Sequence, residues 1–306
     1  MNNHTSVTRF LLLGFSEVRE LQLVHTALVL LVYLAALTRN LLVVTITTLD
    51  RHLHTPMYFF LRNLSILDLC LISVTVPKSI LNSMSQNRSI SFLGCVFQVL
   101  LVILFAASEM FVFTVMPYDR YVAICSPLRN EVVMGRGACV KMVVTSWFSG
   151  GLLGVVFSTG VSSLPFCDSH EVQQFFCDIH SLLKISCSEK HVAEDISIAM
   201  RAASGFFSFG FVVLSYIHIF LAVLRMPSSD GRSKAFSTCL PRLVVFTLFI
   251  TTGSFAYLTP PSASPSTLDL LVSVFYMVVP PNLKPLIYSL RNWDMKATLG
   301  RVLGSA

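Results

Sequence analysis

Four ionisable side chains lie inside long apolar stretches of the sequence and away from the ends of those stretches, namely Arg39, Asp68, Glu109 and Lys284. A charged group is costly to hold within a lipid bilayer, so residues of this kind are functional candidates by default. Opposite charges that meet in a bundle of low dielectric constant offset part of that cost. We therefore expect Lys284 to pair with Asp68 or Glu109, in a polar network that includes Asn40. Arg39 either joins this network or reaches toward lipid headgroups, and the sequence leaves both open.

A second chemical candidate is the acid–base pair in Met116-Pro117-Tyr118-Asp119-Arg120-Tyr121, near the end of an apolar stretch. A carboxylate beside a guanidinium can hold the arginine in place at rest, and its release offers several donors to the carbonyl groups of a partner. Asp119 and Arg120 are therefore candidates for a switch. The alternative is an ordinary pair at a helix end whose side chains reach for water.

Seven apolar stretches must position these residues. A helix that crosses a bilayer needs ~20 mostly apolar residues, and the stretches that meet this length are 23–48, 58–82, 93–125, 139–161, 195–224, 235–260 and 268–290. Hydrophobic residues make up 54% of the chain and charged residues 12%, which excludes an ordinary soluble domain. The basic residues behind the +6 net charge are scattered rather than clustered, so nucleic acid is not an expected partner. We expect an all-α membrane protein, a seven-transmembrane helix bundle in a lipid bilayer.

The distribution of charge predicts which end of the bundle faces the cytosol. With the N-terminus outside, 13 of the 22 lysine and arginine residues fall on the inner side, seven on the outer side and two in the membrane. This follows the positive-inside rule. Asn3 and Asn87 stand in N-glycosylation sequons on the outer side, the second close to the membrane.

Three regions of the chain follow from this orientation. Residues 1–22 are an extracellular N-terminus without a visible cleavable signal, 23–290 are the seven-transmembrane domain, and 291–306 are a cytoplasmic tail. The tail reads as a short amphipathic helix on the membrane surface, or else as a frayed end.

Four of the eight cysteines lie on the expected oxidising side: Cys95, Cys167, Cys177 and Cys187. They allow three disulfide pairings. A bridge from Cys95 to the loop 162–194 would pin a lid over the mouth of the bundle. The rival interpretation is a zinc site, although an oxidising compartment favours disulfides. Its ligands would be Cys167, His170, Cys177 and His180.

Five motifs resemble those of vertebrate odorant receptors, which are rhodopsin-like (class A) G-protein-coupled receptors. They run through essentially the whole chain in the right order: Met57–Leu61, Leu64–Asp68, Pro117–Cys125, Lys234–Cys239 and Pro285–Asn292. Phe176-Cys177-Asp178, with Cys167 and Cys187, resembles the tetrapod-type (class II) members. The resemblance implies the disulfides Cys95–Cys177 and Cys167–Cys187, and a multi-pass protein of the plasma membrane.

The resemblance also implies a function. A small volatile odorant would bind within the bundle and activate a stimulatory olfactory-type heterotrimeric G protein, which raises cyclic AMP. Asp119, Arg120 and Tyr121 would face that G protein, and Tyr216 and Tyr288 would turn inward on activation, although tyrosines at a membrane interface are often plain anchors. No cofactor or resident metal is expected, and the chain is not expected to be an enzyme.

The ligand site should be an apolar cavity among the third, fifth, sixth and seventh spans, under the outer loop. Nothing at its positions resembles a fixed charge for an amine or a phosphate, so the ligand should be mostly apolar. Ser204 and Tyr257 are the candidates for hydrogen bonds to it. Ordinary helix packing is the alternative role of each member of the set, which is Val102, Ile103, Ala106, Ala107, Met200, Ser204, Gly253, Tyr257 and Phe275.

Four residues depart from the family pattern. Arg39 stands for a usual glycine, Pro117 for alanine, Arg242 for histidine and Lys284 for asparagine. Asp68 and Glu109 resemble the inner acidic pair of the family, which can hold a sodium ion or share a proton, and we expect Lys284 to take the place of that cation. Pro117 should kink the third span near Phe113 because it removes a backbone hydrogen bond.

Two other functions stay open at this point. Buried acids and bases also mark the ion paths of transporters and channels, although the odd number of spans without an internal repeat argues against a transporter. A receptor fold that no longer signals is the other alternative, since three of the four departures, at residues 39, 117 and 284, could remove coupling.

Overall fold

The computed structural model describes residues 8–12, 19–84, 89–125, 133–166, 171–172, 174 and 176–185, with a few positions between 210 and 247. Four long helices dominate this part of the chain, and three short strands and two short helices accompany them. The long helices are α1 (Arg19–Leu49), α2 (Pro56–Met84), α3 (Phe92–Cys125) and α5 (Arg136–Ser162). The short elements are β1 (Arg9–Leu12), η1 (Arg51–Leu53), β2 (Ser89–Ser91), β3 (Glu171–Val172) and α6 (Ile179–Lys184).

All four long helices in the described residues are long and apolar enough to cross a membrane. The shortest, α5, has 27 residues, which at 1.5 Å per residue gives about 40 Å against about 30 Å for the hydrocarbon core. Each helix therefore tilts or projects beyond the core. The first four predicted spans lie within these helices, and the mainly helical membrane fold is confirmed. The spans predicted at 195–224, 235–260 and 268–290 and the amphipathic tail lie outside the described residues, apart from isolated helical positions.

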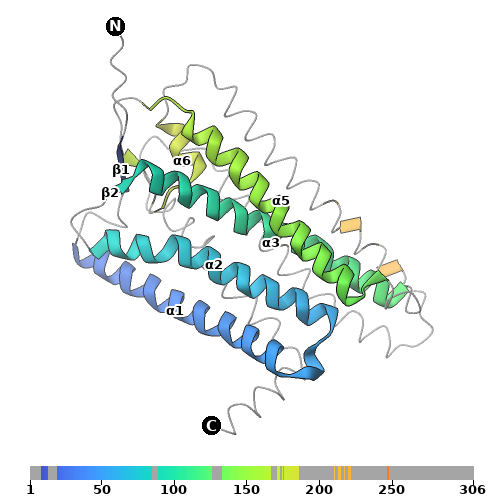
Figure 1. Ribbon diagram of the computed structural model, residues 1–306. Coiled ribbons are helices and arrows are strands. Elements are labelled where there is room, and N and C mark those ends of the chain that lie inside the picture. The colour runs from blue at the N-terminus through green and yellow to red at the C-terminus, as the bar shows by residue number, and fades with distance from the viewer. Residues whose placement is uncertain are drawn as a thin grey trace.

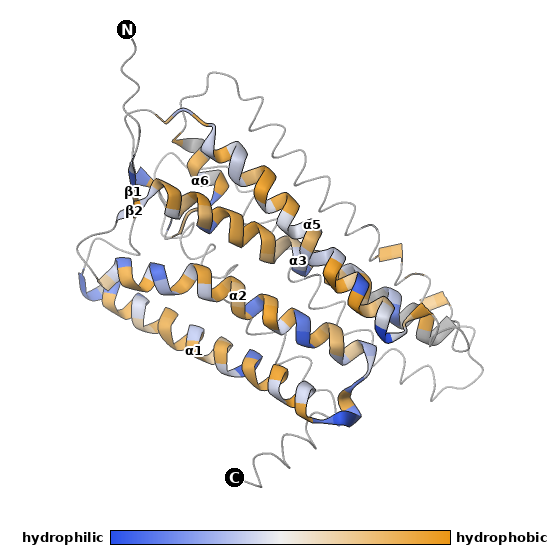
Figure 2. Ribbon diagram, viewed as in Figure 1, coloured by the Kyte–Doolittle hydropathy of each residue, from blue (hydrophilic) through white to orange (hydrophobic). Residues whose placement is uncertain are grey.

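The four helices lie side by side in an antiparallel order (Figure 1). η1 joins α1 to α2 at one end of the bundle, and the three strands lie at the other end, which we call the sheet end. Figure 2 shows that the long helices are mostly apolar along their length, with hydrophilic residues more frequent toward both ends of the bundle. Large apolar side chains are exposed on α1 and α5, as expected where lipid is the solvent. They include Leu23, Leu28, Leu31, Leu41, Val144, Phe148 and Leu152.

Small residues let α5 pack closely on α3. Ser146, Gly150, Gly154 and Ser158 recur every four residues, so they share one helix face, and all four are buried. A Cβ atom built on Gly150 would lie 2.5 Å from the backbone oxygen of Leu104, and one on Gly154 would lie 2.8 Å from the corresponding atom of Leu100. Ser108 Oγ also donates to the backbone oxygen of Ser146 at 3.2 Å. Spacing of this small-xxx-small type brings membrane helices into backbone contact.

Three short strands form a sheet of order β2-β1-β3. β1 pairs antiparallel with β2, with Phe10 opposite Ile90, and parallel with β3, with Leu12 opposite Val172. The end of β2 also starts α3, because Ser91 Oγ accepts a hydrogen bond from the backbone N–H of Gly94 at 3.2 Å. The sequence analysis did not predict these strands. They tie a segment near the N-terminus to two later parts of the chain.

Phe10 anchors this sheet. Its side chain is 1% exposed, whereas that of Leu11 is 45% exposed on the other face of the strand. The ring centroid of Phe10 lies 5.2 Å from that of Phe166 and 6.0 Å from that of Phe92. Residues from three separate segments of the chain therefore meet around one aromatic side chain.

We expect Phe10→Ala to release β1 from the sheet. Loss of a buried phenylalanine costs about 3 kcal/mol, which raises the population of the detached strand roughly a hundredfold if only this segment opens. The measurement is the rate of trypsin cleavage after Arg9 in purified protein, corrected with peptides of the same sequences. Leu11→Ala is the matched control and should change the rate less than threefold. Equal rates for the two variants would mean that the sheet does not hold β1.

Candidate functional site

Four of the predicted ligand residues lie on the half of α3 nearer the sheet end. Val102, Ile103, Ala106 and Ala107 are all half-buried. Their side chains carry no polar group, so this part of α3 offers an apolar surface with two small residues. The remaining members of the set, Met200, Ser204, Gly253, Tyr257 and Phe275, lie outside the described residues.

Neighbouring members of this group contact different clusters. Val102 packs against a cluster of α1 and α2 side chains that contains Phe176. Ile103 packs against a second cluster around Cys95, Cys177 and the strands. Phe176 and Cys177, neighbours in one loop, therefore belong to the two clusters against which Val102 and Ile103 pack.

A disulfide joins Cys177 of this loop to Cys95 near the start of α3, with 5.5 Å between their Cα atoms. The structure thus contains the first of the two bonds that the resemblance implied; Cys167 and Cys187, the partners in the second, lie outside the described residues. This disulfide uses Cys177, which is one of the four ligands in the rival zinc interpretation. Within the described part of the chain, no group of three or more metal-ligating residues occurs.

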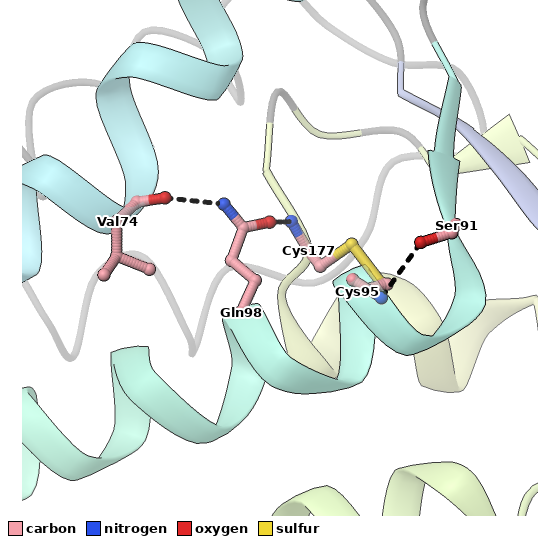
Figure 3. Close-up of a disulfide and its surroundings, with 6 residues drawn as sticks. Val74, Ser91, Cys95, Gln98 and Cys177 are labelled. Carbon is pink, nitrogen blue, oxygen red and sulfur yellow. Dashed lines mark hydrogen bonds between the residues drawn. A yellow bond between two sulfur atoms is a disulfide. The ribbon is translucent and has the colours of Figure 1, made fainter.

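Gln98 supports the same loop from one turn further along α3 (Figure 3). Its Oε1 accepts a hydrogen bond from the backbone N–H of Cys177 at 3.0 Å, and its Nε2 donates to the backbone oxygen of Val74 in α2, also at 3.0 Å. Sequence reasoning missed Gln98. A signal was present, because it is an isolated amide in an apolar stretch three residues after Cys95.

Three of the four residues of the predicted polar network are buried. Asn40 is 0% exposed, Asp68 1% and Glu109 0%, and they come from three different helices, α1, α2 and α3. Asn40 Nδ2 donates to the backbone oxygen of Ala36 at 3.0 Å. Asp68 and Glu109 each have an interaction partner. Lys284, the expected partner of one of these carboxylates, lies outside the described residues.

Arg39 behaves differently from its neighbour Asn40. Its side chain is exposed on α1, whereas that of Asn40 is fully buried. Arg39 has an interaction partner of its own, and both expectations for it, the polar network and the lipid headgroups, stay predictions.

The acid–base pair lies near the end of α3 that is remote from the sheet. Asp119 is buried, and Tyr118 is half-buried against a large apolar cluster that includes Phe60 and Met116. Arg120 and Tyr121 belong to the last turns of α3, which runs through Pro117 to Cys125. Phe220, from the fifth predicted span, packs on the same cluster. The predicted switch residues Tyr216 and Tyr288 lie outside the described residues, as do Arg242 and the sequon residues Asn3 and Asn87.

Comparisons with known proteins agree along almost the whole chain. The olfactory receptor family model matches residues 29–305. Human olfactory receptor 14A2 is 54% identical over 303 residues, which cover 99% of this chain and 96% of the relative. Human olfactory receptor 14A16 is 52% identical over 303 residues, with 99% and 98% covered. Olfactory receptor 1G1 of Gorilla gorilla gorilla is 42% identical over 301 residues, with 98% and 96% covered.

Proposed function

The chain belongs to the olfactory receptor family, and we propose that it binds small, mostly apolar odorants inside its helical bundle and activates a stimulatory olfactory-type G protein that raises cyclic AMP. The family is one of class A G-protein-coupled receptors with seven transmembrane helices, so the chain is a multi-pass membrane receptor and not an enzyme. The observation that carries the proposal is the family match over nearly the whole chain together with the half-buried apolar face of α3.

The nature of the ligand is inferred from α3. Val102, Ile103, Ala106 and Ala107 present only apolar atoms, beside a loop held by a disulfide. Contact with such a surface favours a ligand by roughly 25 cal/mol for each Å² of apolar area removed from water, and an ionised ligand would lose its hydration without a partner. Ser204 and Tyr257 remain the proposed hydrogen-bonding residues.

The orientation is part of the proposal. Disulfides persist in oxidising compartments, so the Cys95–Cys177 bond supports a sheet end that faces the outside of the cell. Residues 1–22 and the sequon at Asn3 would lie on that side. Asp119 and Arg120 would then face the cytosol, where Arg120 can donate to carbonyl groups of a G protein.

The proposal is tested with a cyclic-AMP reporter against a broad odorant panel, with the amount of receptor at the cell surface measured in parallel. We expect the wild type to respond, and Arg120→Ala to lose most of the response at an unchanged surface amount. Arg62→Ala is the matched control, because Arg62 is another arginine of the η1 half of the bundle, stacked 5.4 Å from the ring centroid of Phe59. An equal loss in both variants would contradict a specific role of Arg120.

A receptor that no longer signals is the second candidate, and Pro117 inside α3 is the observation that favours it. A wild type that reaches the surface but stays silent, together with a Pro117→Ala variant that responds, would support this candidate. Odorant-driven current in cells without G-protein signalling would instead support an ion channel.

A further inference from the structure

Gln98 connects three parts of the sheet end through one buried side chain. The residue is 5% exposed, its Nε2 donates to α2 and its Oε1 accepts from the loop (Figure 3). A carboxamide supplies a donor and an acceptor at the same time, whereas a carboxylate only accepts and an ammonium group only donates. The residue type therefore matches the two bonds that the position requires.

The contact with α2 lies close to a proline inside that helix. Pro77 stands inside α2 and has no N–H to donate to the backbone oxygen of Ser73, four residues earlier, and its ring pushes this oxygen away. Helices kink at such positions, and in membranes neighbouring side chains satisfy the backbone groups that become free. The backbone oxygen of Val74, one residue further along, accepts the hydrogen bond from Gln98.

The contact with the loop complements the disulfide. Gln98 follows Cys95 by three residues, so the two side chains share one face of α3, and both reach Cys177 from that face. The disulfide alone leaves rotation about its bonds, and the hydrogen bond at the Cys177 amide removes that freedom. The orientation of the preceding residue is thereby set.

That preceding residue, Phe176, lies beside the proposed ligand positions. It is buried against Val76 and Ile80 of α2, on either side of Pro77, and Val102 packs on the same cluster. A displacement of α2 near Pro77 would therefore reach Phe176 directly through packing and indirectly through Gln98 and Cys177. Both routes end at the ligand positions of α3.

We propose that Gln98 is a positioning residue that couples the Pro77 segment of α2 to the disulfide-bonded loop, and so sets where Phe176 lies beside the odorant. The placement of the loop follows from contacts in the structure, whereas its effect on odorants rests on the proposed function. Gln98 acts through Cys177 and Phe176.

Two variants separate the two hydrogen bonds. Gln98→Met keeps the length of the side chain and removes both bonds, whereas Gln98→Glu keeps an acceptor for the Cys177 amide and loses the donor to Val74 when ionised. Gln22→Met is the matched control, because Gln22 is another buried glutamine that donates to an α2 carbonyl, that of Ser83 at 2.8 Å, at a place remote from Cys177 in the hydrogen-bond network.

The first measurement is amide hydrogen exchange of the purified full-length receptor. In Gln98→Met we expect peptides that span 171–185 to exchange at least about fivefold faster, as expected when a buried hydrogen bond is lost. In Gln98→Glu the Cys177 amide should stay protected while the peptides after Val74 exchange faster. Gln22→Met should leave 171–185 unchanged. The proposal is overturned if Gln98→Met does not speed exchange in 171–185, or if Gln22→Met speeds it equally.

The second measurement is the rank order of the odorants in the panel at matched surface amounts. Gln98→Met should reorder the half-maximal concentrations by about fivefold or more for some odorants, whereas plain destabilisation would only lower the maximal response to all of them. A uniform loss would overturn the role in ligand selection. If the wild type answers no odorant, the proposed function fails by itself, and the exchange data still decide whether Gln98 positions the loop.

Discussion

Gly150→Leu is expected to abolish the delivery of the receptor to the cell surface, because the new side chain would occupy the backbone of α3. Even a single methyl group at this position meets the backbone oxygen of Leu104 at 2.5 Å and also overlaps Ser108 Oγ. Backbone atoms cannot move aside as the end of a flexible side chain can, so the two helices must separate. Overpacking of a well-packed core costs about 1–3 kcal/mol, and a leucine adds three further carbon atoms.

Gly151, the adjacent glycine, is the control, because its substitution should not lower the melting temperature. A Cβ on Gly151 would meet only the Cδ1 atom of Leu104, at 3.9 Å, which is an ordinary contact. Gly151→Ala should therefore keep or slightly raise the melting temperature, since alanine favours the helix by about 1 kcal/mol over glycine. Gly150→Ala should lower it by several degrees. If the purified Gly150→Ala and Gly151→Ala variants had equal melting temperatures, the close packing of α3 and α5 would not determine the stability of the receptor.

Lys284→Met is expected to cause the second large loss of folded receptor. Asp68 and Glu109 are almost fully buried, and we propose that Lys284 pairs with one of them. Removal of one member of a buried ion pair leaves an uncompensated charge and costs about 3–5 kcal/mol. The amount of receptor at the cell surface and the melting temperature of the purified protein measure this effect.

Second-site variants identify the partner of Lys284. Asp68→Asn or Glu109→Gln, whichever neutralises the true partner, should restore part of the stability that Lys284→Met removes, and the other should not. Sodium should leave the melting temperature of the wild type unchanged relative to potassium. Lys284→Asn, with the residue usual in the family, should gain a rise with sodium. A clear sodium-dependent rise in the wild type would rule out the pairing.

The fold class could be predicted because a membrane span is a local property of the sequence. About 20 apolar residues in a row are sufficient for a helix to cross a bilayer, and the four spans in the described part of the chain lie inside observed helices, which extend the predicted ranges by up to four residues at an end. The family could be recognised for a similar reason, since each motif is a short continuous segment. The olfactory receptor relatives confirm that recognition.

The sheet could not be predicted because short strands depend on partners that are far away in the sequence. β3 has two residues, and β1 owes its pairing to segments about 80 and 160 residues later. The pattern of Arg9–Leu12 is too short to separate a strand from an irregular segment. The roles of Phe10 and Leu11 therefore became visible only once the strand had its partners.

The sequence by itself determined the membrane fold, the receptor family and the positions of the charged residues within the spans, since these depend on local hydropathy and on continuous motifs. Only the tertiary structure showed which of two adjacent residues in a helix faces a neighbouring helix. It separated Gly150 from Gly151 and Asn40 from Arg39, because the rotation of a helix about its axis decides which side chain faces a neighbour. It also brought Gln98 to Val74 and Cys177, since three segments that are separate in the sequence meet there.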